Sequence, residues 1–292
     1  MVAIFAISSS FFLALSYVFT RVGLRHSNPL SGVLITMVSS LAISLIISLF
    51  AIPLKLFFNK GVLFFIAVGV LGPFLARFFF FIGVQRVGAS IAAPISEIKA
   101  LFSAITAVLI LGESFTFSIA LGMILITAGA AIIGSEESGG QIEKKWSRKD
   151  LIFPFLAGAG WGVSHIFRKM GLNIIPEPIV GVTVQNVTAL AFFPLLTLNQ
   201  RHQQRVVWSD KRAWFIFSLA GISTFIAHLC LFWALDLGQV VVVSPLSSLT
   251  PFFVLLLVGI FLRKLERVTY KIILGAIFIA GGTVLLTLMP LG

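Results

Sequence analysis

Charged residues are scarce in this sequence, and acidic residues are the scarcest of them. Only 11% of the 292 residues are charged, with 10 Asp and Glu against 21 Lys and Arg. An ordinary soluble domain carries about 25% charged residues. Hydrophobic residues make up 59% of the chain, and the mean hydropathy is +1.10. The composition therefore excludes an ordinary soluble domain and predicts a polytopic membrane protein.

Cysteine and catalytic motifs are also missing. The single cysteine, Cys230, lies inside an apolar run, which excludes a disulfide within the chain and a cysteine-based metal site. The sequence has no His-Glu-x-x-His motif, no phosphate loop and no Ser-His-Asp set with a favourable spacing. We therefore expect no catalytic residues, no metal and no cofactor.

The net charge of +11 could indicate a nucleic-acid-binding protein. Apart from Arg77 and Lys99, however, the basic residues lie near the ends of apolar stretches or in loops, and no recognition motif accompanies them. This distribution is typical of loops beside an anionic leaflet. We expect a lipid bilayer, and no nucleic acid, as the partner of these charges.

Long apolar stretches account for most of the chain. Ten of them are long enough to cross a bilayer: about 2–24, 29–52, 61–86, 89–111, 114–134, 151–172, 178–198, 212–236, 239–262 and 267–289. We interpret the first as a retained helix and not a signal peptide. The polar segment 135–150 divides the chain into residues 1–134 and 151–292, with five stretches in each part. The predicted fold is an all-α membrane protein with ten transmembrane helices.

The two parts resemble each other in sequence. Ser16 to Leu24 align with Ser164 to Leu172, Phe81 aligns with Phe232, and Gly122 and Gly129 align with Gly275 and Gly282. Because each part has an odd number of spans, the second must enter the bilayer from the opposite side. The pattern predicts two inverted five-helix repeats, an architecture that places a solute site at the midplane and permits alternating access.

Prolines and glutamates recur at matched positions of the two parts. Pro94 precedes Gly112-Glu113, while Pro245 and Pro251 precede Glu266. With two five-helix repeats, these residues make the whole chain resemble the EamA-type transporters of the drug/metabolite transporter superfamily. The resemblance implies a solute carrier. The three prolines are candidate helix breakers, since each removes a backbone donor and can expose carbonyl groups to a solute; a simple kink without ligand contact is the alternative.

Three charged residues lie deep in the hairpin 74–106, which turns at Val87-Gly88-Ala89. Arg77, Glu97 and Lys99 are each about ten residues from the turn, roughly 10–17 Å below the interface and near the bilayer midplane. Residues two apart on a helix point about 200° apart, so Glu97 and Lys99 cannot share a face. We predict that Arg77 and Glu97 form a buried ion pair, and that Lys99 faces a hydrated cavity. The pair could be purely structural.

Further polar and aromatic residues are candidate substrate contacts, together with Lys99. They share predicted midplane depth or alignment with another candidate: Ser96, Ser103, Tyr17, Trp161, His165, His228, Ser247 and Thr250. Each has a simpler alternative. A serine can bond back to its own helix, a histidine can pack instead of carrying a proton, and an aromatic ring can be a packing or interface anchor.

These features together predict a multi-pass secondary transporter of the plasma membrane that carries a small organic solute. The basic residues favour a solute with a carboxylate or another anionic group. The rival hypothesis is a membrane scaffold or sensor that retains the fold, and an intramembrane enzyme is a weaker third. A cavity lined by Lys99, Ser96 and Ser103 would favour transport. A coupling proton and a homodimer remain open.

The loop charges and the family resemblance predict opposite orientations of the chain in the membrane. An even number of spans places both termini on one side, which holds only Lys55, Lys60, Arg168 and Lys169 among the predicted loop charges. Loops rich in Lys and Arg stay in the cytoplasm, so the charge distribution places both termini outside. The resemblance implies that both termini are cytoplasmic. We favour the orientation given by charge.

Overall fold

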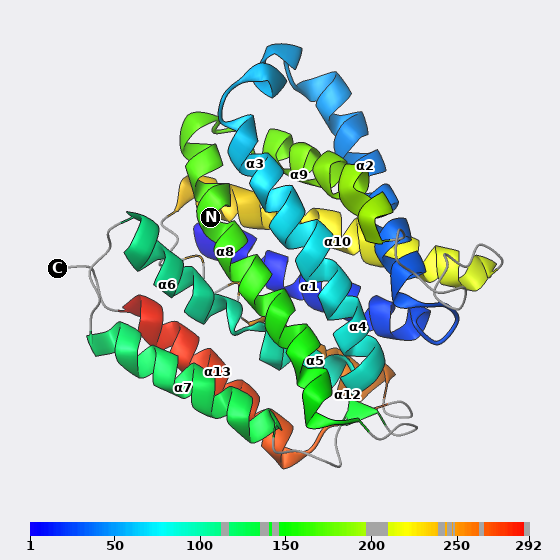
Figure 1. The fold of residues 1–292 in the computed structure, drawn as a ribbon, viewed down its shortest axis with the longest axis vertical. Coiled ribbons are helices and arrows are strands. Elements are labelled where there is room, and N and C mark those ends of the chain that lie inside the picture. Colours follow the sequence, from blue (N-terminus) through cyan, green and yellow to red (C-terminus); the bar gives the residue numbers. More distant parts are fainter. Residues whose placement is uncertain are drawn as a thin grey trace.

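The computed structural model is built almost entirely from helices (Figure 1). It describes residues 1–111, 117–134, 140–141, 146–196, 210–238, 243, 247, 249–262 and 266–288. The one sheet among these residues is a two-residue antiparallel pairing of β1 (Gly140–Gln141) with β2 (Glu266–Arg267). Part of the predicted linker 135–150 thus pairs with the segment that precedes the last helix.

In the first part of the chain, short 3₁₀ and π-helical segments separate some of the α-helices. Its elements are α1 (Val2–Gly23), α2 (Pro29–Ala51), the 3₁₀ helix η1 (Leu54–Phe58), α3 (Val62–Gly69), the π-helical segment η2 (Val70–Ala76), α4 (Arg77–Val87), α5 (Ala89–Ser96), α6 (Lys99–Leu111) and α7 (Phe117–Gly134). Asn28 caps α2, since its side chain accepts a hydrogen bond of 2.9 Å from the Ser31 amide.

The second part has longer uninterrupted helices. Its elements are the 3₁₀ helix η3 (Arg148–Leu151), α8 (Ile152–Ile174), α9 (Pro178–Phe192), the 3₁₀ helix η4 (Phe193–Leu196), α10 (Lys211–Leu237), α12 (Thr250–Phe261) and α13 (Tyr270–Leu288). Asp210 caps α10 by accepting from the amides of Arg212 and Ala213, at 2.8 and 3.3 Å.

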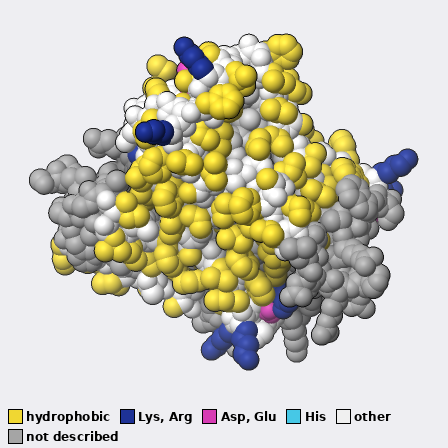
Figure 2. Space-filling model, turned by 45° about the horizontal axis from the view of Figure 1, so that its top comes forward, with side chains coloured by type: hydrophobic (Ala, Val, Ile, Leu, Met, Phe, Trp, Pro, Cys, Tyr) yellow, Lys and Arg dark blue, Asp and Glu magenta, His cyan; other side chains and the backbone are white. Residues whose placement is uncertain are grey.

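The surface and the helix lengths are those of a multi-pass membrane protein. Six helical stretches are long and apolar enough to cross a bilayer: Val2–Gly23, Pro29–Ala51, Val62–Val87, Arg148–Ile174, Pro178–Leu196 and Lys211–Leu237. Ala120–Ile133, Thr250–Phe261 and Tyr270–Gly282 are shorter apolar helices. Hydrophobic side chains cover much of the face in Figure 2. Many large hydrophobic side chains are exposed, and Phe50 is 90% exposed. Lipid would solvate this surface.

Two of the predicted spans are not regular α-helices. In the span 61–86, Pro73 lies in the π-helical segment η2, which ends directly before Arg77. The span 89–111 is interrupted at Glu97 and Ile98, between α5 and α6. Gly88, with φ 87°, makes the turn between α4 and α5, a conformation that side chains other than glycine rarely adopt. The π-helical segment η2 and the interruption between α5 and α6 therefore both lie next to the charged residues that we predicted to be buried.

Glycines let α8 approach the interruption between α5 and α6. A Cβ atom on Gly158 would lie 2.6 Å from the carbonyl oxygen of Ser96, and one on Gly162 would clash with the carbonyl oxygen of Lys99. Hydrogen bonds of the tighter i to i+3 type occupy this turn, from the Glu97 amide to Pro94 and from the Ile98 amide to Ile95. Close backbone packing therefore holds the turn in place, as is typical of membrane helices.

Glycines also join α7 and α13, which lie side by side at one edge of the molecule (Figure 1). A Cβ on Gly129 would lie 2.6 Å from the carbonyl oxygen of Gly275, and one on Gly282 would lie 2.6 Å from that of Gly122. These are the four glycines that align between the two parts of the sequence.

The Gly162 contact gives a test of this packing. Gly162→Ala should destabilise the protein by about 1–3 kcal/mol, because the methyl group meets the backbone of Lys99, which cannot move aside as a side chain could. The measurement is the melting temperature in detergent. Gly281→Ala is the matched control, since nothing lies within 4 Å of its added Cβ. Equal melting temperatures for the two variants would contradict the packing.

Candidate functional site

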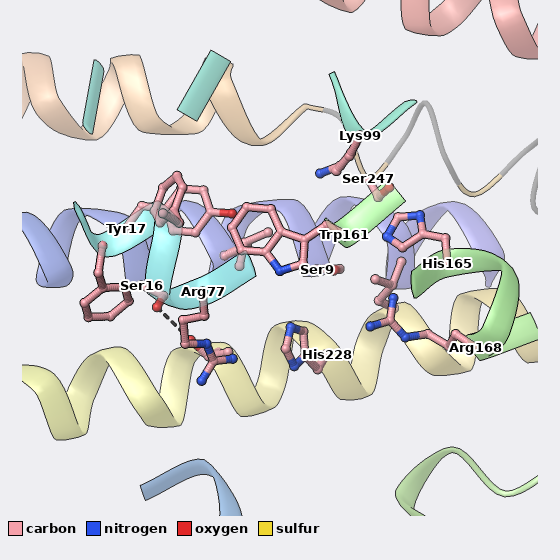
Figure 3. A pocket seen from close by; sticks show the side chains of 15 residues that line it. Ser9, Ser16, Tyr17, Arg77, Lys99, Trp161, His165, Arg168, His228 and Ser247 are labelled. Carbon is pink, nitrogen blue, oxygen red and sulfur yellow. Dashed lines mark hydrogen bonds between the residues drawn. The ribbon is translucent and has the colours of Figure 1, made fainter. Parts of the chain in front are cut away.

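A pocket lies among the membrane helices and takes its lining from both parts of the chain. Side chains of α1, α4, α8 and α10 surround it, joined by Lys99 at the start of α6 and by Ser247 (Figure 3). It encloses about 640 Å³ including its open end, of which about 40 Å³ is available to the centres of water molecules. Since one water needs about 10–15 Å³ on this measure, the pocket as it stands holds a few waters. A larger solute requires the lining to move.

The structure brings half of the predicted site residues together in this pocket. Its lining includes Tyr17, Arg77, Lys99, Trp161, His165, His228 and Ser247. They come from helices far apart in sequence, so their assembly depends on the tertiary fold. Their role in binding a solute stays a prediction.

Three other predicted substrate contacts are buried but do not line the pocket. The Ser96 hydroxyl donates to the carbonyl of Ala93 at 2.7 Å, and the Thr250 hydroxyl donates to that of Ser247 at 3.1 Å. These are bonds within one chain segment, the alternative that we named for serines. Ser103 is 5% exposed and lies beside Gly162. Of the three residues expected to mark a transport cavity, Lys99 alone contributes to the lining.

The three predicted helix breakers differ from one another. Pro94 lies inside α5, two residues before that helix ends. Pro251 lies in the first turn of α12, where a helix needs no backbone donor, so it begins a helix and does not break one. Pro245 lies outside the described residues. Pro73, which the sequence analysis did not single out, lies in the π-helical segment before Arg77.

The predicted ion pair is wrong: Glu97 pairs with Lys99 and not with Arg77. The Lys99 Nζ atom lies 2.9 Å from Oε1 of Glu97, and the two side chains are 7% and 0% exposed. The prediction assumed a continuous helix, in which residues two apart point away from each other. Because the helix is interrupted between them, this rule does not apply, and both side chains reach the same space.

Arg77 is buried without the carboxylate that we expected beside it. The residue is 5% exposed, and its Nη1 atom has no hydrogen-bond partner among the described residues. Figure 3 shows its guanidinium group in the pocket, next to α10. A buried N–H group without a partner is costly, so this atom is available to bind a solute.

Arg168 is the pocket residue that the sequence analysis missed. We counted it with the loop charges because it lies near the end of the predicted span 151–172, but in the structure Arg168 lies within α8 and is only 2% exposed. Its guanidinium carbon lies 4.8 Å from the centre of the Phe232 ring. One signal could have revealed it: Arg168 follows His165 by three residues, so a helix places both on one face.

A chain of hydrogen bonds links Arg168 to His228 through Gln185. The Arg168 Nη2 atom donates to Oε1 of Gln185 at 3.4 Å, and Nε2 of Gln185 lies 3.0 Å from Nδ1 of His228. The guanidinium requires the amide oxygen, so the amide NH₂ faces His228 and Nδ1 of the ring accepts. His228 then carries its proton on Nε2, which is a donor in a pocket-lining ring.

Aromatic rings form another part of the lining. The Tyr17 and Phe80 ring centres are 4.0 Å apart, and those of Phe80 and Trp161 are 5.3 Å apart. In Figure 3, Tyr17 and Trp161 lie on the far side of the pocket from Arg77, His228 and Arg168. The pocket therefore has a cationic side along α10 and an aromatic side along α1 and α8.

The fold and the pocket are those of a helical, multi-pass membrane protein with a polar interior site. Comparison with known families gives the particular class. The chain matches the EamA-like transporter family over residues 1–135 and 148–288, and it belongs to that family. The resemblance predicted from the sequence is confirmed.

Individual relatives are more distant. A protein of Archaeoglobus fulgidus described as an uncharacterized transporter is 29% identical over 148 residues, 49% of this chain. The match spans 48% of that relative, about half its length. A solved crystal structure of another protein has 18% sequence identity and a TM-score of 0.68, covering 98% of this chain and 95% of its own. At that identity the likeness shows the fold alone.

The Glu97–Lys99 pair yields a prediction on stability. Glu97→Gln or Lys99→Met alone should each cost about 3–5 kcal/mol, because the remaining partner is left as an unpaired buried charge. The double variant should lose much less than the sum of the two. Unfolding in detergent provides the measurement.

The exposed pair Arg86–Asp150 is the matched control for this cycle. Its atoms are as close, at 2.8 Å, but the Arg86 side chain is 49% exposed. The same cycle with Arg86→Gln and Asp150→Asn should give a coupling of about 0–1 kcal/mol. A coupling for Glu97 and Lys99 no larger than this value would show that the two charges are not paired.

Proposed function

We propose that this protein is a secondary transporter of the plasma membrane that moves a small organic solute with an anionic group by alternating access. The observation that carries the proposal is the pocket itself. It lies between helices of both parts of the chain and presents Arg77, Arg168 and Lys99 to its interior, with Glu97 as the one buried carboxylate among the described residues. Charges at membrane depth are typical of a substrate path.

The proposed mechanism requires two inverted five-helix repeats, residues 1–134 and 151–292. Pairs of equivalent contacts support them. Gly129 aligns with Gly282, and Gly275 aligns with Gly122. When each residue of the Gly129–Gly275 contact is replaced by its aligned residue, the result is the Gly282–Gly122 contact, which the structure also contains. A packing pattern that is unchanged when the halves are exchanged is what a two-fold relation between repeats would produce.

Phenylalanine contacts support the same relation. Phe81 and Phe217 have ring centres 6.1 Å apart, and Phe232 and Phe65 have ring centres 5.9 Å apart. Phe81 aligns with Phe232, and the same alignment brings Phe65 to within one position of Phe217. Each pair joins α10 to the span formed by α3, η2 and α4, once near each end.

The small free volume of the pocket fits a transporter between its open states. A solute larger than a few waters enters only when the helices around the pocket separate on one side. In the proposed cycle the two halves rock about the pocket, so that it opens to each side in turn. A scaffold would not need this polar pocket at membrane depth.

Transport by reconstituted protein is the test. We expect proteoliposomes to take up at least one small carboxylic acid from a radiolabelled panel in a saturable manner. Arg77→Gln should reduce the uptake by about tenfold or more, because it removes a charge that binds the anionic group. Folding of each variant is checked by its melting temperature.

Lys60→Gln is the matched control, since Lys60 is exposed and directly precedes the same membrane span. It should transport as the unmodified protein does. No saturable uptake of any solute would favour the scaffold hypothesis. Normal uptake by a well-folded Arg77→Gln variant would remove Arg77 from the site.

A further inference from the structure

Among the described residues, the pocket has more positively charged side chains than carboxylates. Lys99 is neutralised by Glu97, whose Oε1 atom is 2.9 Å from the lysine nitrogen. Arg77 and Arg168 are 5% and 2% exposed, and neither has a carboxylate within 4.0 Å in the part of the chain that the structure describes. The pocket therefore carries two positive charges that no described side chain compensates.

Two such charges are expensive in a membrane interior unless a negative partner is present for part of the cycle. We propose that the solute supplies both partners: it is a dianion with two acid groups, one bound by Arg77 and the other by Arg168. This inference rests on the proposed transport function and narrows its substrate class.

The placement of the two arginines favours two acid groups over one. Figure 3 shows Arg77 and Arg168 on opposite sides of His228 along α10. A separation seen in projection is a lower limit on the true separation, so both guanidinium groups do not converge on a single point beside His228. A solute with acid groups at its two ends matches this arrangement.

Each arginine has donors available for an acid group. The Nη1 atom of Arg77 and the Nε atom of Arg168 have no hydrogen-bond partner among the described residues. The bond from Nη2 of Arg168 to Gln185 and the contact with the Phe232 ring fix the orientation of that guanidinium group. Fixed donors lose little freedom when they bind, so the site is organised in advance for a carboxylate.

The space between the two arginines is also suited to the middle of such a solute. His228 lies between the two arginines along α10 (Figure 3). Its hydrogen bond with Gln185 leaves the ring proton on Nε2, which can donate to a hydroxyl or keto oxygen. The rings of Tyr17 and Trp161 face it from the other side of the pocket (Figure 3). A short dicarboxylate would place its acid groups at the arginines and its carbon chain against the rings.

Matched acids of one chain length test the charge requirement. Binding of succinate, butyrate and succinamide to the detergent-purified protein at neutral pH is measured by titration calorimetry, with ethyl phosphate as a solute whose charge lies on a single phosphate. We expect succinate to bind at least about tenfold tighter than butyrate, and succinamide not to bind. Equal affinities for succinate and butyrate, or a clear preference for ethyl phosphate, would overturn two-point binding.

Variants then assign each acid group to its arginine. Arg168→Gln should abolish the preference for succinate over butyrate while butyrate binding persists through Arg77, and Arg77→Gln should do the same through Arg168. Arg212→Gln, an exposed position at the start of α10, is the control and should keep the full preference. A variant that retains the preference would show that its arginine binds neither acid group.

Two further measurements distinguish a failure of two-point binding from a failure of the transport function. If either arginine variant fails to fold, a chain-length series from malonate to adipate on the unmodified protein replaces it; two-point binding predicts one best length, and a flat series contradicts it. Saturable uptake of monoanions without any preference for dianions would overturn this inference and leave the transport function standing. Absence of both binding and uptake for every solute would overturn the transport function itself.

Discussion

Two buried guanidinium groups without carboxylate partners are the constraint on which this structure depends. In a membrane protein, such groups must face a cavity or pair with another group, because lipid cannot solvate them. Arg77 and Arg168 reach the same pocket from different parts of the chain, and one lysine–glutamate pair beside them is already neutral. The charge that remains uncompensated is what gives the pocket its proposed selectivity for an anionic solute.

Irregular backbone places these groups where a regular helix would not. The π-helical segment with Pro73 ends immediately before Arg77, and the interruption after Ser96 lets Glu97 and Lys99 meet. Such segments lose regular hydrogen bonds, and they persist in membranes only where protein surrounds them. Here α8 provides that surrounding, since it approaches the interruption at Gly158 and Gly162 and the π-helical segment at Gly160. The glycines and the charged residues are therefore parts of one arrangement.

Much of the architecture could be predicted from the sequence, because apolar length is a strong signal in membrane proteins. Six predicted spans correspond to helices long enough to cross a bilayer, and the family resemblance is confirmed. The depth of Arg77 and Lys99 was also sufficient to place them in the pocket. These predictions need only distance along a helix, which the sequence supplies directly.

The incorrect predictions depended on the direction in which a side chain points from its helix. The Arg77–Glu97 pair was wrong because the helix was assumed to continue through Glu97, and two adjacent 3₁₀-type bonds change the direction of the side chains there. Arg168 was counted with the loop charges because it lies near the end of the predicted span 151–172, although the packing of α8 buries it. Gln185, which links Arg168 to His228, has no sequence signal of its own. Contacts of this kind depend on tertiary packing, which spacing alone does not reveal.

The central claim is that a solute binds between Arg77 and Arg168. The most direct measurement is a crystal structure of the protein soaked with bromosuccinate, in which anomalous scattering locates the bromine atom. We predict one bromine peak inside the pocket, with carboxylate density at both guanidinium groups, and no such peak in crystals of Arg168→Gln. Bromine peaks found only outside the pocket, or a peak that is unchanged in the variant, would contradict the account.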